Sequence, residues 1–190
     1  MGRHGPVSGS ETLPLTPMSK RALRKYLDSQ EAETLREQLL ELYERLPQVK
    51  TYYNFVFKPD EEALIRTARE KIRKEYQPRG RRRPKARRSV AQKFIRQYQM
   101  LGMEPTALAD LMGFNLETAL RYAQDRNCPE TFYRSMLNSF DQWLVWLVRE
   151  GLVREFEPRI RTYVRAVETA GWPNRDRFAD RLNTVINGSC

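Results

Sequence analysis

Residues 132–148 read FYRSMLNSFDQWLVWLV, and this stretch decides the fold class. Its large apolar side chains recur three and four positions apart, a spacing that places them on one face of an α-helix. They are Phe132, Tyr133, Met136, Leu137, Phe140, Trp143, Leu144, Leu147 and Val148. Pro129 precedes the stretch and Gly151 follows it, and these residue types are typical of the two ends of a helix. We expect this segment to be the central, most buried helix of an all-α protein.

Helical spacing continues on both sides of this stretch, from Ser19 to residue 187, with Pro, Gly, Ser or Asp between the periods. The pattern predicts about nine helices with short connections, packed as antiparallel hairpins in a single all-α domain over residues 18–187. Residues 1–17 hold Pro and Gly among small polar residues, so we expect a disordered N-terminal lead. No repeat of fixed period is visible, so a solenoid is not indicated, while elongated or HEAT-like packing stays open.

Several local details of the helices follow from residue type. Ser19 and Asp60 are expected helix caps, and Pro105 is expected to open a helix. Gly113 and Asn115 would permit a break in that helix. An aromatic cluster at helical spacing is expected to lie in the core. Its members are Tyr52, Tyr53, Phe55 and Phe57.

The supply of reactive side chains limits the chemistry. The chain has one histidine, His4, and two isolated cysteines, Cys128 and Cys190. Zinc sites and catalytic triads need more such residues, and no Gly-rich phosphate loop is present. We therefore expect no metal, no cofactor and a non-enzymatic protein. Carboxylate chemistry stays open, although acidic residues on helices are usually solvated. The carboxylates in question are Asp110, Glu117, Asp125 and Asp141.

The sequence shows no membrane segment. No stretch approaches the roughly 20 apolar residues that cross a bilayer, and residues 1–17 lack the apolar core of a signal peptide. Two isolated cysteines cannot form a disulfide framework. We therefore expect a cytoplasmic location and no membrane partner.

A basic segment stands apart from the rest of the chain. Residues 77–103 contain nine Lys or Arg and no acidic residue, and without these nine the net charge of +10 would fall to about +1. We expect a basic loop at residues 77–88, followed by a helix that begins near Lys85 after Pro84. The candidate nucleic-acid or phosphate-binding residues are Arg79, Arg81, Arg82, Arg83, Lys85, Arg87, Arg88, Ser89, Lys93 and Arg96.

Phosphate is the natural ligand of such a surface. Guanidinium groups bind phosphate with two hydrogen bonds, and the first turn of a helix offers free N–H donors. No aromatic residue is interleaved with the arginines, so any contact is expected with the nucleic-acid backbone rather than with bases. The sequence therefore predicts binding of RNA, DNA or a phosphorylated ligand.

Two alternatives stay open. In the first, the basic segment is a solvated loop that compensates acidic neighbours such as Glu70, Glu75 or the helix at residues 31–44. In the second, the protein is a helical interaction or adaptor module for an acidic protein surface. The more exposed of Trp143 and Trp146 is then the expected anchor, whereas Asn138 and Ser139 are expected to form hydrogen bonds between helices.

Five motifs resemble one known family. They are SKRALRKYL at 19–27, ELYER at 41–45, KARRSVAQK at 85–93, LADLM at 108–112 and FYRSMLNSF at 132–140. Together they look like an uncharacterised bacterial family of unknown function, over Ser19 to about Phe178. The resemblance implies a small, helical, cytoplasmic bacterial protein. It brings no established activity, ligand or catalytic residue.

Overall fold

The computed structural model describes residues 18–77, 80, 83–124 and 126–188. Within these residues nine α-helices are formed and no strand, which confirms the all-α prediction. By its internal contacts the chain divides into two compact units, Met1–Asn54 and Phe55–Cys190. Each unit is described by itself.

The first unit contains α1 (Lys20–Asp28), α2 (Ala32–Arg45) and most of α3 (Pro47–Phe57). As predicted, Ser19 caps α1, because its Oγ accepts a hydrogen bond from the Ala22 N–H at 3.2 Å. None of the residues of these three helices is buried. Tyr52 is 45% exposed and Phe57 81% exposed, so the prediction that the aromatic cluster lies in the core is wrong for them. All four aromatic residues belong to α3, none of whose residues is buried, although Phe55 is partly buried against the hydrophobic core.

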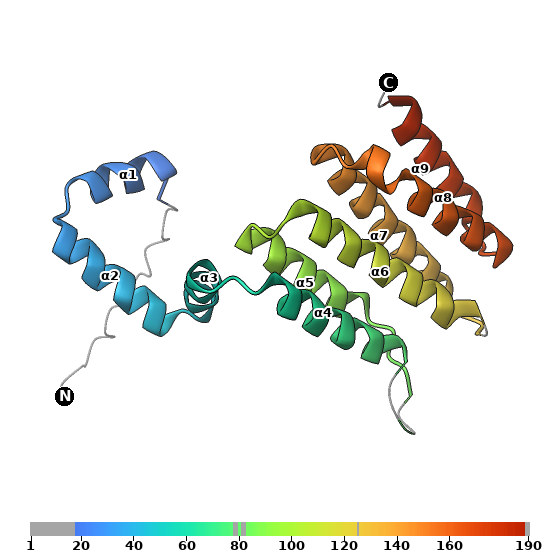
Figure 1. The fold of residues 1–190 in the computed structure, drawn as a ribbon, viewed down its shortest axis with the longest axis horizontal. Coiled ribbons are helices and arrows are strands. Elements are labelled where there is room, and N and C mark those ends of the chain that lie inside the picture. The colour runs from blue at the N-terminus through green and yellow to red at the C-terminus, as the bar shows by residue number, and fades with distance from the viewer. Residues whose placement is uncertain (1–17, 78–79, 81–82, 125, 189–190) are drawn as a thin grey trace, which may run out of the picture. The chain divides into compact units, whose positions relative to one another are not determined.

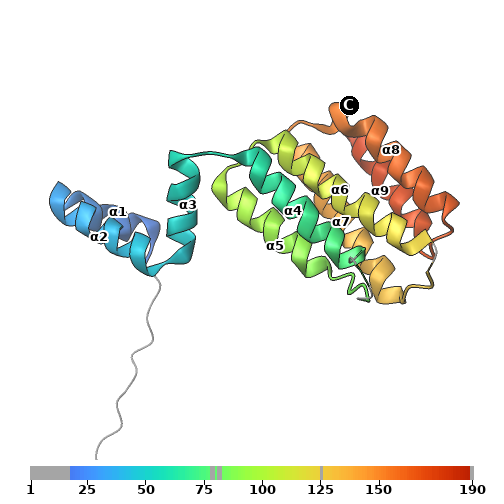
Figure 2. The same ribbon diagram turned by 60° about the horizontal axis from the view of Figure 1, so that its bottom comes forward.

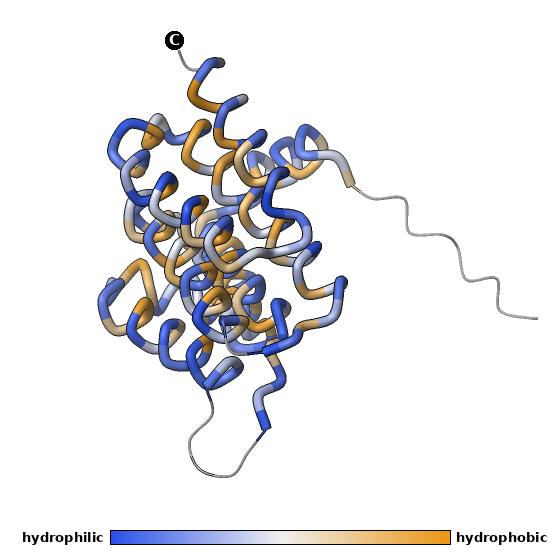
Figure 3. Tube along the Cα trace, turned by 90° about the vertical axis from the view of Figure 1, so that its right-hand side faces the viewer, coloured by the Kyte–Doolittle hydropathy of each residue, from blue (hydrophilic) through white to orange (hydrophobic). Residues whose placement is uncertain are grey.

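The second unit holds six helices that follow one another side by side, as Figures 1 and 2 show. They are α4 (Glu61–Tyr76), α5 (Arg88–Leu101), α6 (Pro105–Gln124), α7 (Glu130–Arg149), α8 (Val153–Thr169) and α9 (Arg175–Gly188). Asp60 caps α4 through a hydrogen bond from the Ala63 N–H, and Pro105 opens α6, both as predicted. Hydrophobic and hydrophilic residues alternate within the turns of these helices in Figure 3, the pattern of helices with one buried face.

The central helix of this unit is α6, so the assignment of that place to residues 132–148 is wrong. Helix α6 packs against α4, α5, α7 and α8, and eleven of its residues are buried, against nine of α7. Small residues such as Ala109, Gly113 and Ala119 let its neighbours approach closely. By contrast α7 leaves Val145 and Val148 exposed. The large side chains of α7 gave the stronger sequence signal, but small residues can be more deeply enclosed.

Helix α6 continues through Gly113 and Asn115 without the break that these residues permit. At Gly113 a Cβ atom would lie 2.9 Å from both Arg159 Cζ and Trp143 Cζ2. Glycine is therefore required there for the close approach of two side chains and not for a bend in the backbone.

Candidate functional site

The structure divides the ten predicted binding residues into separate groups. Arg79, Arg81 and Arg82 lie outside the described residues. Arg83 and Lys85 are exposed on the loop that precedes α5. Arg87 and Arg88 make side-chain hydrogen bonds that position them.

The end of the basic loop is tied to the last turn of α4 at Glu75. The Glu75 carbonyl accepts hydrogen bonds from the backbone N–H groups of Lys85 at 3.0 Å and Ala86 at 2.9 Å. The Arg87 guanidinium donates to both carboxylate oxygens of Glu75, at 2.9 and 2.8 Å. These hydrogen bonds lower the pKa of Glu75. Glu75 therefore compensates the charge of Arg87. This contact agrees with the alternative in which the basic segment compensates acidic neighbours such as Glu75.

This attachment also moves the start of the helix. Ala86 has a φ of 48°, in the left-handed region, and α5 begins at Arg88 rather than near Lys85. The prediction that the helix follows Pro84 is wrong, because the N–H groups of Lys85 and Ala86 satisfy a carbonyl of α4. Lys85 and Arg87 consequently lie outside the face of α5.

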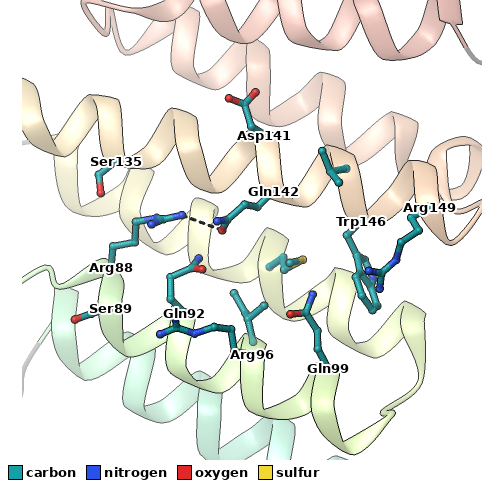
Figure 4. Close-up of a pocket in the computed structure, with 13 residues that line it drawn as sticks. Arg88, Ser89, Gln92, Arg96, Gln99, Ser135, Asp141, Gln142, Trp146 and Arg149 are labelled. Carbon is teal, nitrogen blue, oxygen red and sulfur yellow. Dashed lines mark hydrogen bonds between the residues drawn. The ribbon is translucent and has the colours of Figure 1, made fainter. Parts of the chain in front are cut away.

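A groove of about 680 Å³ runs between α5 and α7, with Met112 of α6 in its wall. Figure 4 shows its polar side chains facing one another across the groove. Helix α5 contributes Arg88, Ser89, Gln92, Ile95, Arg96 and Gln99. Helix α7 contributes Ser135, Asp141, Gln142, Val145, Trp146 and Arg149. Of the predicted residues, Arg88, Ser89 and Arg96 therefore come together, while Lys93 is exposed on α5 outside the groove.

Arg88 is the most strongly positioned of these residues. It is half-buried, its Nε donates to Ser139 Oγ at 2.7 Å, and its Nη2 donates to Gln142 Oε1 at 2.8 Å. Both acceptors are neutral, so among the described residues no carboxylate compensates this charge. Burial lowers the pKa of Arg88, and the positive charge of Arg96 acts in the same direction. The groove thus contains a fixed guanidinium that lacks a counter-charge.

Two further arginines add to the positive charge of the groove. Arg96 forms no ion pair within the described part of the chain. Arg149 lies over the Trp146 ring, 4.3 Å from its centroid, and its Nε is 2.7 Å from a Glu150 carboxylate oxygen. One carboxylate, Asp141, lines the groove, and it pairs with Arg181 at 3.0 Å. Arg149 is thus paired with Glu150, and Asp141 with Arg181, so Arg88 and Arg96 carry the uncompensated positive charge of the groove.

The other charged cluster of the unit is compensated. Arg159 of α8 donates to Glu117 Oε1 and to Asp110 Oδ1, each at 2.6 Å, and Arg69 of α4 also pairs with Asp110. The two acidic residues of α6 are therefore engaged by guanidinium groups rather than solvated. Asp125, the remaining carboxylate of the predicted set, lies outside the described residues. This cluster joins α4, α6 and α8 through ion pairs.

The wall of the groove on α7 was not predicted from the sequence. Ser139 was expected to form a contact between helices, and it does so by accepting the bond from Arg88. Trp143 and Trp146 were expected to differ in exposure, but they are 1% and 6% exposed, and neither is an exposed anchor. Trp146 is fixed by a hydrogen bond from its Nε1 to the Pro105 carbonyl at 3.1 Å. The signal that could have indicated the groove was the polar Ser139 within an apolar stripe.

Neither a metal-binding cluster nor a membrane-spanning helix is present among the described residues. No cluster of three or more His, Cys, Asp or Glu side chains in this part of the chain could hold a metal ion. None of the helices described is long and apolar enough to cross a membrane.

Fold and groove together define an all-α protein with a positively charged groove. The chain belongs to a family described as "Family of unknown function (DUF6155)", whose model matches residues 18–185. No curated protein and no solved structure matches the chain. The resemblance to an uncharacterised family is thereby confirmed, and the bacterial origin and cytoplasmic location stay predictions.

Proposed function

We propose that this protein is a non-enzymatic binding protein that holds the phosphate backbone of a nucleic acid in the groove between α5 and α7. The observation that carries the proposal is the environment of Arg88, a half-buried guanidinium held by Ser139 and Gln142 and by no carboxylate among the described residues. Burial of an uncompensated charge is unfavourable for the free protein. An anionic ligand would supply the missing charge.

The hydrogen bonds of Arg88 also leave it competent to bind. Nε and Nη2 each donate to a neighbour, and a guanidinium has five N–H donors in a fixed fork. Donors therefore remain for a phosphate, and the two existing bonds hold the fork in place before the ligand arrives. Arg96 lies eight residues further along the same helix, a rise of about 12 Å, which suits an extended polyanion better than a single phosphate ion.

The exposed cations near the groove extend this surface. Lys93 lies on α5, and Arg83 and Lys85 lie on the preceding loop. Exposed cations contribute through release of counterions from the nucleic acid, without sequence preference. The proposal therefore includes strong salt dependence of binding.

The experiment is fluorescence anisotropy of a labelled RNA oligonucleotide with wild type and single variants, at about 50 mM salt and above. Arg88→Gln and Arg96→Gln should each weaken binding, by about tenfold for the loss of a charge-assisted hydrogen bond. Arg154→Gln is the matched control, because Arg154 is exposed on α8 outside the groove and the charge change is the same. The proposal fails if the wild type does not bind, or if all three variants lose affinity equally.

A second candidate function, a protein-interaction module, is favoured by α2. Leu35, Leu39 and Leu42 of α2 and its C-cap residue Leu46 are spaced four, three and four residues apart, as in a coiled-coil seam. Leu39, Leu42 and Leu46 are 41%, 45% and 43% exposed. If this seam binds a protein, affinity purification with wild type should recover that protein, and purification with the double variant Leu39→Lys, Leu42→Lys should not. Met100→Lys, at an exposed position of α5, should keep it.

A further inference from the structure

The two ends of the groove differ in chemistry. One end is formed by Arg88, Ser89 and Ser135, as Figure 4 shows, and offers cationic and hydroxyl donors. At the other end lie Gln99, Trp146 and Arg149. A ligand that was only a chain of phosphates would need no aromatic or amide groups at this second end.

The second end has the features of a platform for a planar ring. The Arg149 guanidinium lies 4.3 Å from the centroid of the Trp146 ring, and the Arg149 side chain is 61% exposed. Trp146 is fixed by its bond to the Pro105 carbonyl, so the guanidinium rests on a rigid ring. Guanidinium planes stack on nucleic-acid bases as aromatic side chains do. The outer surface of Arg149 is thus open to a base.

Glutamine amides line the α5 wall of the groove, Gln99 at the platform and Gln92 nearer to Arg88. Gln92 and Gln99 line the groove, and within the described residues neither side chain forms a hydrogen bond. A glutamine amide carries both donors and an acceptor, which match the edges of bases. Val145, 67% exposed, adds apolar surface to the opposite wall, on α7. These groups suit a base and not a phosphate.

We propose that the groove takes a single-stranded nucleic acid, with phosphates on Arg88 and Arg96 and an unpaired base stacked on Arg149. This inference rests on the proposed function and names its ligand class. The bases of a duplex are stacked and paired in its interior, so they cannot lie flat on Arg149. In a single strand they are free to turn into the groove while the backbone stays on the arginines.

The experiment compares three labelled probes in the anisotropy assay: an RNA strand, the same strand paired to its complement, and a strand of equal length with abasic positions. The wild type should bind the intact strand about tenfold or more tightly than the other two, the range that one stacked base gives. Arg149→Lys keeps the charge and removes the plane. It should weaken binding of the intact strand about tenfold and leave binding of the abasic strand unchanged.

The controls separate this inference from the proposed function. Arg96→Gln should weaken binding of the intact and abasic strands by the same factor, because it contacts phosphate. Arg154→Lys, outside the groove, should change neither. Equal affinity for all three probes, or an Arg149→Lys variant that binds like wild type, overturns the single-strand inference and leaves backbone binding intact. Absence of binding to any probe overturns both.

Discussion

Replacement of Gly113 by alanine tests how closely the helices pack behind the groove. The added Cβ would meet Arg159 Cζ and Trp143 Cζ2 at 2.9 Å. Trp143 is 1% exposed, and the Arg159 guanidinium is held by Glu117 and Asp110. Neither group can move aside without loss of packing or of ion pairs. We therefore expect Gly113→Ala to destabilise the second unit.

Opposing effects set the size of this change. Alanine is favoured over glycine inside a helix by about 1 kcal/mol. Overpacking of a core costs roughly 1–3 kcal/mol, and displacement of Arg159 weakens charge-assisted hydrogen bonds worth roughly 1.5–3 kcal/mol each. The expected net loss in the free energy of unfolding is roughly 1–3 kcal/mol, because the clash outweighs the gain in helix propensity.

Urea unfolding of four proteins measures this loss: wild type, Gly113→Ala, Arg159→Gln and the double variant. A lower midpoint with an unchanged slope reports a change in stability. In the Arg159→Gln background the guanidinium carbon is absent, so the cost of Gly113→Ala should fall by roughly 0.5–3 kcal/mol. A Gly113→Ala protein that is as stable as wild type would refute the packing argument.

Other predictions follow from individual contacts. Arg159→Gln should lower the free energy of unfolding by roughly 1.5–3 kcal/mol. Arg161→Gln should lower it less, because the exposed pair of Arg161 with Glu157 within α8 contributes little. Equal effects of the two variants would contradict the central role of Arg159. Because the Arg87 guanidinium lowers the pKa of Glu75, their pair stabilises the fold above the ordinary carboxylate pKa. This stabilisation is lost as the pH falls through the lowered pKa, so acid should lower the protection factors of the loop-end amides, measured against intrinsic exchange at the same pH, in wild type and not in Glu75→Gln. Burial raises the pKa of the Cys128 thiol. We therefore expect slow alkylation of Cys128 in the native protein and rapid alkylation in urea, measured by peptide mass spectrometry. Rapid alkylation of the native protein would contradict the burial of Cys128.

Local features of the fold were predictable because they depend on neighbouring residues. Ser19 and Asp60 cap their helices through bonds to residues three positions away, and the Pro105 helix start is also local. The start of α5 was not predictable in this way. It depends on hydrogen bonds from Lys85 and Ala86 to Glu75, ten or more residues earlier in the chain.

The groove could be predicted only in part. Arg88, Ser89 and Arg96 are among the predicted binding residues and share the groove face of α5, since helical periodicity determines which residues share a face, whereas Lys85 and Lys93 lie outside the groove. Its partner wall on α7 could not be found, because the contact of Arg88 with Ser139 spans 51 residues. The contact of Arg149 with Trp146 is local, three residues apart in α7, but its position opposite α5 in the groove depends on the same tertiary packing. Sequence periodicity specifies faces, whereas only the tertiary structure specifies which faces meet.

The most direct test of the account follows the Nε–H signal of Arg88 by nuclear magnetic resonance while single-stranded RNA is added. Arg88 is the uncompensated guanidinium of the groove, and Arg159 is the internal reference, since Glu117 and Asp110 already engage it. We expect the Arg88 signal to shift progressively to saturation and the Arg159 signal to stay in place. An Arg88 signal that does not move when the RNA is bound would contradict the claim that this groove is the binding site.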